Sequence, residues 1–125
     1  MTVRPEFDVI QWHLFLNTSK VKSAQTILQR LSKILEVSLE TTSMEPYWKD
    51  ASKMDVRASS SIGSTDKPEV AVFSLMQSVQ RLANGFTTSG PQRYEGDRAE
   101  MVVLATSGFA DAGISWLEAS IRNFD

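Results

Sequence analysis

The chain has 125 residues, of which 42% are hydrophobic and 22% are charged, and these values predict one soluble domain that spans residues 1–125. Its 13 basic and 15 acidic residues leave a formal charge of −2, which excludes the global basic excess that gathers nucleic-acid phosphates. Because cysteine is absent, disulfides and thiolate metal sites are excluded as well.

The first stretch of the chain, residues 1–8, carries Arg4, Glu6 and Asp8, and no long apolar run follows it. This composition predicts neither an export signal nor a membrane span. Together with the lack of cysteine, it predicts a cytoplasmic protein that has no membrane partner.

The first predicted strand covers residues 9–17, with Trp12 and Leu14 on one side of the extended chain and His13 and Phe15 on the other. Bulky apolar residues on both sides indicate a strand in the interior of a sheet.

A helix is predicted next, capped by Thr18 or Ser19. One stripe of this helix is apolar and needs a partner surface, which the face of a sheet would supply. The stripe consists of Val21, Ala24, Ile27, Leu28, Leu31, Ile34 and Leu35.

Two more strands are predicted at residues 37–44 and 54–62, the second with alternating apolar and polar residues and therefore one solvent-exposed face. Between them, residues 45–50 contain Pro46, which removes a hydrogen-bond donor from the ladder, so a loop or a bulge is expected there.

The second predicted helix covers residues 68–84 and ends before Gly85. Asp66 and Glu69 have the spacing of a capping box, and Pro68 stands where no intrahelical donor is needed.

The last third of the chain is predicted to be extended. Residues 86–88 begin a strand, residues 89–91 and 94–97 are turns, and the apolar run 101–105 is a central strand. Residues 114–124 fit both a helix and a strand. A strand is favoured, because the short connection from Gly108 suits an antiparallel hairpin with residues 101–105.

This order of elements predicts an α+β fold. The expected architecture is a two-layer sandwich of a mainly antiparallel sheet with two helices on one face. It is a ferredoxin-like βαββα arrangement with additional C-terminal strands.

Few residues have the chemistry of a catalytic or metal site. The only histidine, His13, lies within the most hydrophobic strand, and a structural role is predicted for it. Glu95, Asp97 and Glu100 follow a turn, but their spacing departs from that of an EF-hand loop, so a solvated acidic loop is expected. The glycines form no phosphate- or dinucleotide-binding fingerprint. The prediction is therefore no catalytic residue, no metal and no cofactor.

The residues most typical of a protein interface are Tyr47 and Trp48, which lie in the proline-containing break with Glu45, Lys49, Asp50 and Asp55 around them. Exposed tryptophan and tyrosine ringed by charges serve as anchors in protein–protein interfaces. The alternative is that Trp48 folds back as a lid on the core.

In size, acidity, lack of cysteine and alternating α/β organisation, the chain resembles the small cytoplasmic immunity proteins that neutralise bacterial toxin domains, including those of contact-dependent inhibition systems. This resemblance implies one cognate protein partner, a toxin domain whose active site or adjacent surface is blocked, and no bound nucleic acid. The candidate contact residues are Glu45, Tyr47, Trp48, Asp50, Asp55, Glu95 and Asp97.

Two other classes of function stay open. A small isomerase or hydrolase would use His13, or a carboxylate of residues 95–100, in a cleft. A self-associating regulatory domain, for example a homodimer, would pair through the strand that bears Asp55 and Arg57.

Overall fold

The computed structural model describes residues 6–124. It consists of β1 (Phe7–Leu16), α1 (Val21–Leu35), β2 (Glu40–Tyr47), β3 (Asp50–Thr65), α2 (Pro68–Leu82), β4 (Thr87–Arg93), β5 (Ala99–Ala105) and β6 (Ile114–Arg122). Residues 1–5, which belong to the stretch predicted not to be an export signal, lie outside the described residues.

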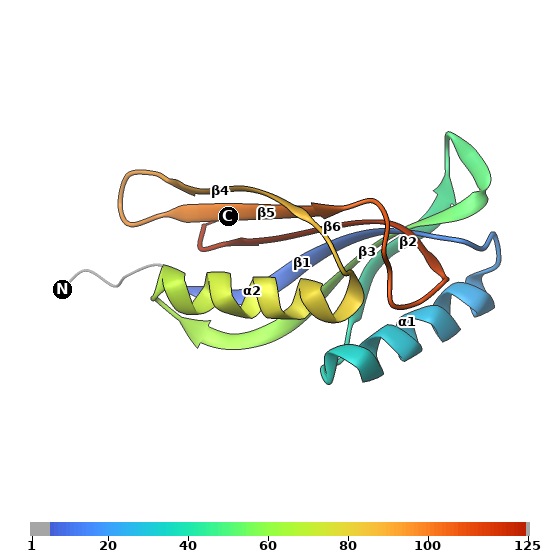
Figure 1. The fold of residues 1–125 in the computed structure, drawn as a ribbon, viewed down its shortest axis with the longest axis horizontal. Helices are drawn as coiled ribbons and strands as arrows, with labels where there is room; N and C mark the ends of the chain where they lie inside the picture. Colours follow the sequence, from blue (N-terminus) through green and yellow to red (C-terminus); the bar gives the residue numbers. More distant parts are fainter. Residues whose placement is uncertain (1–5, 125) are drawn as a thin grey trace.

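The six strands form one open antiparallel sheet in the order β2-β3-β1-β6-β5-β4. Figure 1 shows α1 and α2 on the same side of this sheet, and the β2–β3 hairpin on the opposite side from α1. The predicted α+β class, the mainly antiparallel sheet and the two helices on one face are thus confirmed. Within residues 114–124, Ile114–Arg122 form a strand, β6, that pairs with β5 as predicted.

The strand order is not ferredoxin-like. In a ferredoxin-like unit the strand after the second helix pairs with β1, whereas here β4 lies at the far edge of the sheet. The chain returns through β5 and β6, and β6 pairs with β1. The ferredoxin fold has a single strand on this side of β1. Here the three C-terminal strands, β4, β5 and β6, form a meander in its place.

The core lies between the two helices and the sheet. Leu14 pairs with Val56 on β3 and Leu117 on β6, and all three side chains are completely buried. The helices contribute Leu31 from α1 and Leu75 from α2, both completely buried. In the predicted stripe of α1, Ala24, Ile27, Leu28 and Leu35 are buried as well and Ile34 is half-buried, whereas Val21 is 54% exposed, so the prediction is wrong for this first residue of the helix. The buried indole of Trp12 donates a hydrogen bond from Nε1 to Ser60 Oγ over 2.8 Å, so the core contains no unpaired polar group at this point.

Both predicted helix caps are wrong by a small shift in register. The N-cap residues are Lys20 for α1 and Lys67 for α2, and neither has a capping side-chain hydrogen bond. Thr18 and Thr65 instead accept a hydrogen bond from the backbone N–H of the N-cap two residues later. Because α2 begins at Pro68, a capping box would need Lys67 and Val70, and neither side chain can form it.

Several predicted boundaries also change. Of the two alternatives for segment 45–50, the loop is wrong and a bulge-like irregularity is present: β2 continues through Pro46 to Tyr47, the register with β3 shifts between these two residues, and only residues 48–49 form the turn. Pro46 is tolerated because β2 is an edge strand, which is where proline occurs within sheets. Residues 89–91 lie within β4, where the register shifts between Ser89 and Gln92.

The position of β3 corrects one further expectation. Asp55 and Arg57 lie on a strand that is paired with β2 on one side and β1 on the other, so this strand has no free edge for self-association. In the described part of the chain, neither helix has the length and apolar character needed to cross a bilayer.

Candidate functional site: an aromatic patch on the open face of the sheet

The face of the sheet that is turned away from the helices carries a cluster of aromatic rings. His13 and Phe15 alternate with the buried residues Leu14 and Leu16 along β1, so they point to this open face. Phe15 stacks with Tyr47 from β2, with ring centroids 4.2 Å apart and planes inclined by 16°. It also stacks with Trp116 from β6 at 4.8 Å and 27°. We call Phe15, Tyr47, Trp48 and Trp116 the aromatic patch.

Stacking fixes the rings of the patch relative to one another. Offset-stacked aromatic pairs stabilise by about 0.5–1.5 kcal/mol beyond the area that they bury. Phe15, Tyr47 and Trp116 nevertheless stay only half-buried, because no helix lies over them. The patch is therefore a rigid apolar surface that is open to a partner.

Trp48 extends the patch at the tip of the β2–β3 hairpin. Its side chain is 82% exposed, so the alternative of a lid on the core is wrong. The indole packs edge-on against Tyr47 at 6.3 Å, and Lys49 Nζ lies 4.9 Å from its centroid on the ring face. A tryptophan with this exposure has most of its surface left to bury in an interface.

His13 and Asp55 form a hydrogen-bonded pair next to the patch. His13 Nε2 lies 2.8 Å from Asp55 Oδ1, and the two side chains are only 17% and 19% exposed. The imidazole also contacts Phe15 and Trp116 edge-on at 5.2 and 5.1 Å. His13 thus contacts two rings of the patch on the same face of the sheet, and its predicted structural role stays a prediction.

A histidine oriented by a carboxylate is also the general-base half of many catalytic sites. A base needs a substrate within hydrogen-bond reach, and small-molecule sites are concave. Five hollows on the surface formed by residues 6–124 have volumes of about 260–450 Å³, and neither His13 nor Asp55 lines any of them. The pair thus lies outside these five hollows.

Carboxylates surround the patch on the side of β2 and β3. Glu45 is the cross-strand partner of Asp55, so two acidic side chains stand opposite each other on the open face. Asp50 follows in the hairpin, where the hydroxyl and the backbone N–H of Ser52 donate to it and lower its pKa below the ordinary value. The ion pairs among residues 6–124 are His13–Asp55, Arg30–Asp111 and Arg81–Glu36, so neither Glu45 nor Asp50 takes part in one.

The structure brings five of the seven predicted contact residues together. Glu45, Tyr47, Trp48, Asp50 and Asp55 all belong to the patch or to its acidic margin. Glu95 and Asp97 lie in the β4–β5 turn, which Figure 1 places at the opposite end of the sheet from the β2–β3 hairpin. A partner on the aromatic patch would reach them only by spanning the whole sheet.

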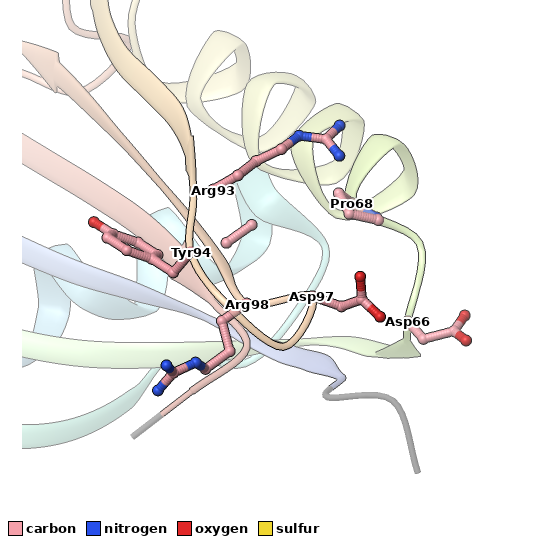
Figure 2. Close-up of a pocket in the computed structure, with 7 residues that line it drawn as sticks. Asp66, Pro68, Arg93, Tyr94, Asp97 and Arg98 are labelled. Atoms are coloured by element: carbon pink, nitrogen blue, oxygen red, sulfur yellow. The ribbon is translucent and has the colours of Figure 1, made fainter. Parts of the chain in front are cut away.

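The β4–β5 turn borders a hollow of about 260 Å³ that Asp66, Pro68, Arg93, Tyr94, Asp97, Arg98 and Ala99 line. In Figure 2, Tyr94 and Arg98 point to one side of the turn, while Asp97 points to the other side, where Asp66 lies. The polar groups do not converge on one point, as a binding pocket requires. The turn itself is held by Asn123, which donates to the carbonyl of Asp97 and accepts from the N–H of Ala99.

No group of three or more histidine or acidic side chains within residues 6–124 has the arrangement of a metal site, and this includes the cluster around Glu95. Comparison with family models, with curated proteins and with solved structures finds no match for this chain.

Sequence reasoning identified Tyr47 and Trp48 but missed Phe15 and Trp116 as members of the same surface. The available signal was the alternation of β1, in which Phe15 faces away from the buried residues Leu14 and Leu16. That Trp116 lies beside Phe15 depends on the pairing of β6 with β1.

Proposed function

We propose that the protein is a non-enzymatic binding protein whose partner is another protein docked on the aromatic patch. The observation that carries this proposal is the stack of Tyr47, Phe15 and Trp116 on a sheet face that no helix covers. Tyrosine and tryptophan are the residues that contribute most binding energy in protein interfaces, and rings already fixed in place lose little conformational freedom on binding.

The finer proposal is that the partner is a toxin domain and that the protein neutralises it as a cognate immunity protein. Its support is the resemblance in size, acidity and α/β organisation, together with a docking surface suited to one tight partner. Coverage of the toxin's active site, or of a surface next to it, would block its activity without any chemistry by this chain.

The experiment begins with the gene next to the one that encodes this protein, because an immunity gene directly follows its toxin gene. The two products are co-expressed, and their complex is tested for tight binding and for loss of the toxin's activity. Charge reversal at Asp50 and Asp55 should slow association in a salt-dependent manner, whereas Trp48→Ala should mainly accelerate dissociation.

Glu95→Lys and Tyr94→Ala serve as matched controls, since both residues belong to the turn at the other end of the sheet. Circular dichroism establishes that each variant is folded. If Trp48→Ala and the charge reversals at Asp50 and Asp55 all leave the association and dissociation rate constants unchanged at low and high salt, the proposed surface is wrong. If the neighbouring gene product neither binds nor harms cells, the immunity assignment is wrong.

The second candidate function is a small hydrolase or isomerase, and the His13–Asp55 hydrogen bond of 2.8 Å is the observation that favours it. Such an enzyme would use His13 as the base and Asp55 to orient it. Complete loss of a hydrolase or isomerase activity in the His13→Gln variant, with an unchanged fold, would support this candidate over the binding protein.

A further inference from the structure

Glu45 and Asp55 are opposite each other on neighbouring strands, beside the rings of the aromatic patch. Side chains in this relation have Cβ atoms about 4.5–5.5 Å apart, and two like charges there destabilise the sheet. The arrangement is unfavourable in the isolated protein, and a cation placed between the two carboxylates would relieve it.

The chain itself does not supply that cation. Asp55 shares its Oδ1 with His13, and Glu45 is exposed without an ion-pair partner among residues 6–124. The two basic residues nearest to Asp55 on β3 are Lys53 and Arg57, and neither forms an ion pair with Glu45 or Asp55 in the described chain.

We infer that the partner docked on this aromatic face presents a basic surface and inserts an arginine side chain beside the patch. This inference rests on the proposed function. The guanidinium lies against the exposed rings of Tyr47 and Trp48 and pairs with Glu45 and Asp55. A planar guanidinium suits this position, because it stacks on aromatic faces and donates to two carboxylate oxygens at once.

The Trp48 ring already contacts a cation in the isolated protein, since Lys49 Nζ lies 4.9 Å from its centroid. The Phe15 ring stacks on the Tyr47 ring, and the Trp48 ring packs edge-on against Tyr47. Aromatic faces beside carboxylates are the two components of an arginine site, and here Tyr47 and Trp48 occur on the same hairpin as Glu45, which has no ion-pair partner among residues 6–124, and Asp55, whose partner is His13.

A sheet face with exposed aromatic rings is also the surface on which single-stranded nucleic acids stack their bases. Those surfaces carry basic residues that attract the phosphates. Basic residues lie near the rings as well, with Lys49 over Trp48, but Asp55 is the register partner of Phe15 and Glu45 is that of Asp55, so the two carboxylates in this row would repel a phosphate backbone. Charge complementarity thus favours a basic protein surface over a nucleic acid.

The first test uses the full-length protein and two probes, a nona-arginine peptide and a ten-nucleotide oligouridylate. Tryptophan fluorescence is a direct readout, because Trp48 and Trp116 belong to the patch and Trp12 is buried. Nona-arginine should change the fluorescence, and Glu45→Gln should weaken its binding about fivefold or more, as loss of one charge-assisted contact predicts. The matched variant Glu95→Gln removes the same charge from the opposite end of the sheet and should change the affinity less than about twofold.

A second readout concerns stability. Glu45→Gln should raise the unfolding midpoint by about 1–4 °C, since it removes the like-charge pair. Equal effects of Glu45→Gln and Glu95→Gln on nona-arginine binding would overturn the inference, because they would indicate only general attraction of opposite charges. Binding of oligouridylate that Tyr47→Ala abolishes would overturn it in favour of a nucleic acid.

The cognate complex separates this inference from the proposed function. If Tyr47→Ala weakens the complex and Glu45→Gln does not, the arginine site is wrong and the docking surface stands. If neither variant changes the affinity, the docking surface itself is wrong.

Discussion

Tyr47→Ala tests the aromatic patch most directly, because the structure predicts a small effect on folding and a large effect on binding. Tyr47 is half-buried near the end of the edge strand β2, and its main packing partner is Phe15, at 4.2 Å between ring centroids. Loss of one stacked pair costs about 0.5–1.5 kcal/mol. For a domain of this size, 1 kcal/mol shifts the unfolding midpoint by about 3–6 °C, so this loss lowers it by about 2–9 °C.

The expected effect on binding is larger. Interface tyrosines at the centre of a docking surface contribute about 2 kcal/mol or more, which corresponds to an affinity about 30-fold weaker. Most of the change should appear in the dissociation rate. Calorimetry or circular dichroism gives the unfolding midpoint, and biosensor kinetics with the neighbouring gene product gives both rate constants.

Tyr94→Ala is the matched control. Tyr94 is 44% exposed and packs edge-on against Phe124 in the β4–β5 region, at the other end of the sheet. It should leave the affinity unchanged. A Tyr47→Ala variant that is folded and binds the partner within about threefold of the original protein would refute the reasoning, because no hot-spot residue has so small an effect.

Three further outcomes follow from the structure. Leu31→Ala should lower the free energy of unfolding by about 2–5 kcal/mol in chemical denaturation, since Leu31 is completely buried, and a change near zero would contradict its place in the core. His13→Gln should keep binding within about threefold, because an amide can still donate to Asp55 and no charged group of the acidic margin is lost. Asp111→Asn should reduce stability at neutral pH in a pH-dependent manner. Arg30, hydrogen-bonded to Asp111 at 2.7 Å, lowers the pKa of this carboxyl below its ordinary value of 3.8. The stabilisation is therefore fully present above that ordinary value and is lost as the pH falls through the lowered pKa of the folded state. Thermal melts of both proteins should differ at pH 7 and converge in strong acid, and a constant difference at every pH would contradict this reasoning.

The helices and most strands could be predicted because their signals are local. The apolar stripes of α1 and α2 repeat with the period of a helix, and the predicted stripe residues Leu31 and Leu75 are completely buried. The caps could not be predicted to the residue, because the N-cap positions are held by Lys20 and Lys67, which have no capping side-chain hydrogen bond, while Thr18 and Thr65 accept from the N–H groups of these N-caps.

The strand order could not be predicted because it depends on contacts that are distant in sequence. A chain of the order βαββα is compatible with a strand next to β1 directly after the second helix, which is the ferredoxin-like expectation. The alternative, in which β4 starts at the far edge and β6 returns to β1, has the same local patterns. What decides between them is the fit of Leu117 and Ala119 against Leu14 and Trp12, which pairs residues about 100 positions apart.

The same long-range pairing explains the incomplete prediction of the site. Tyr47 and Trp48 stood out locally, but a strand with apolar residues on both sides normally lies between two layers. β1 is such a strand, and it has helices on one face only. Phe15 on the uncovered face is joined by Trp116 through strand pairing and by Tyr47 through the hairpin. The helices cover only one side of the sheet, and β1 is apolar on both sides. Its uncovered side is therefore suited to a second layer, which a docked partner would supply.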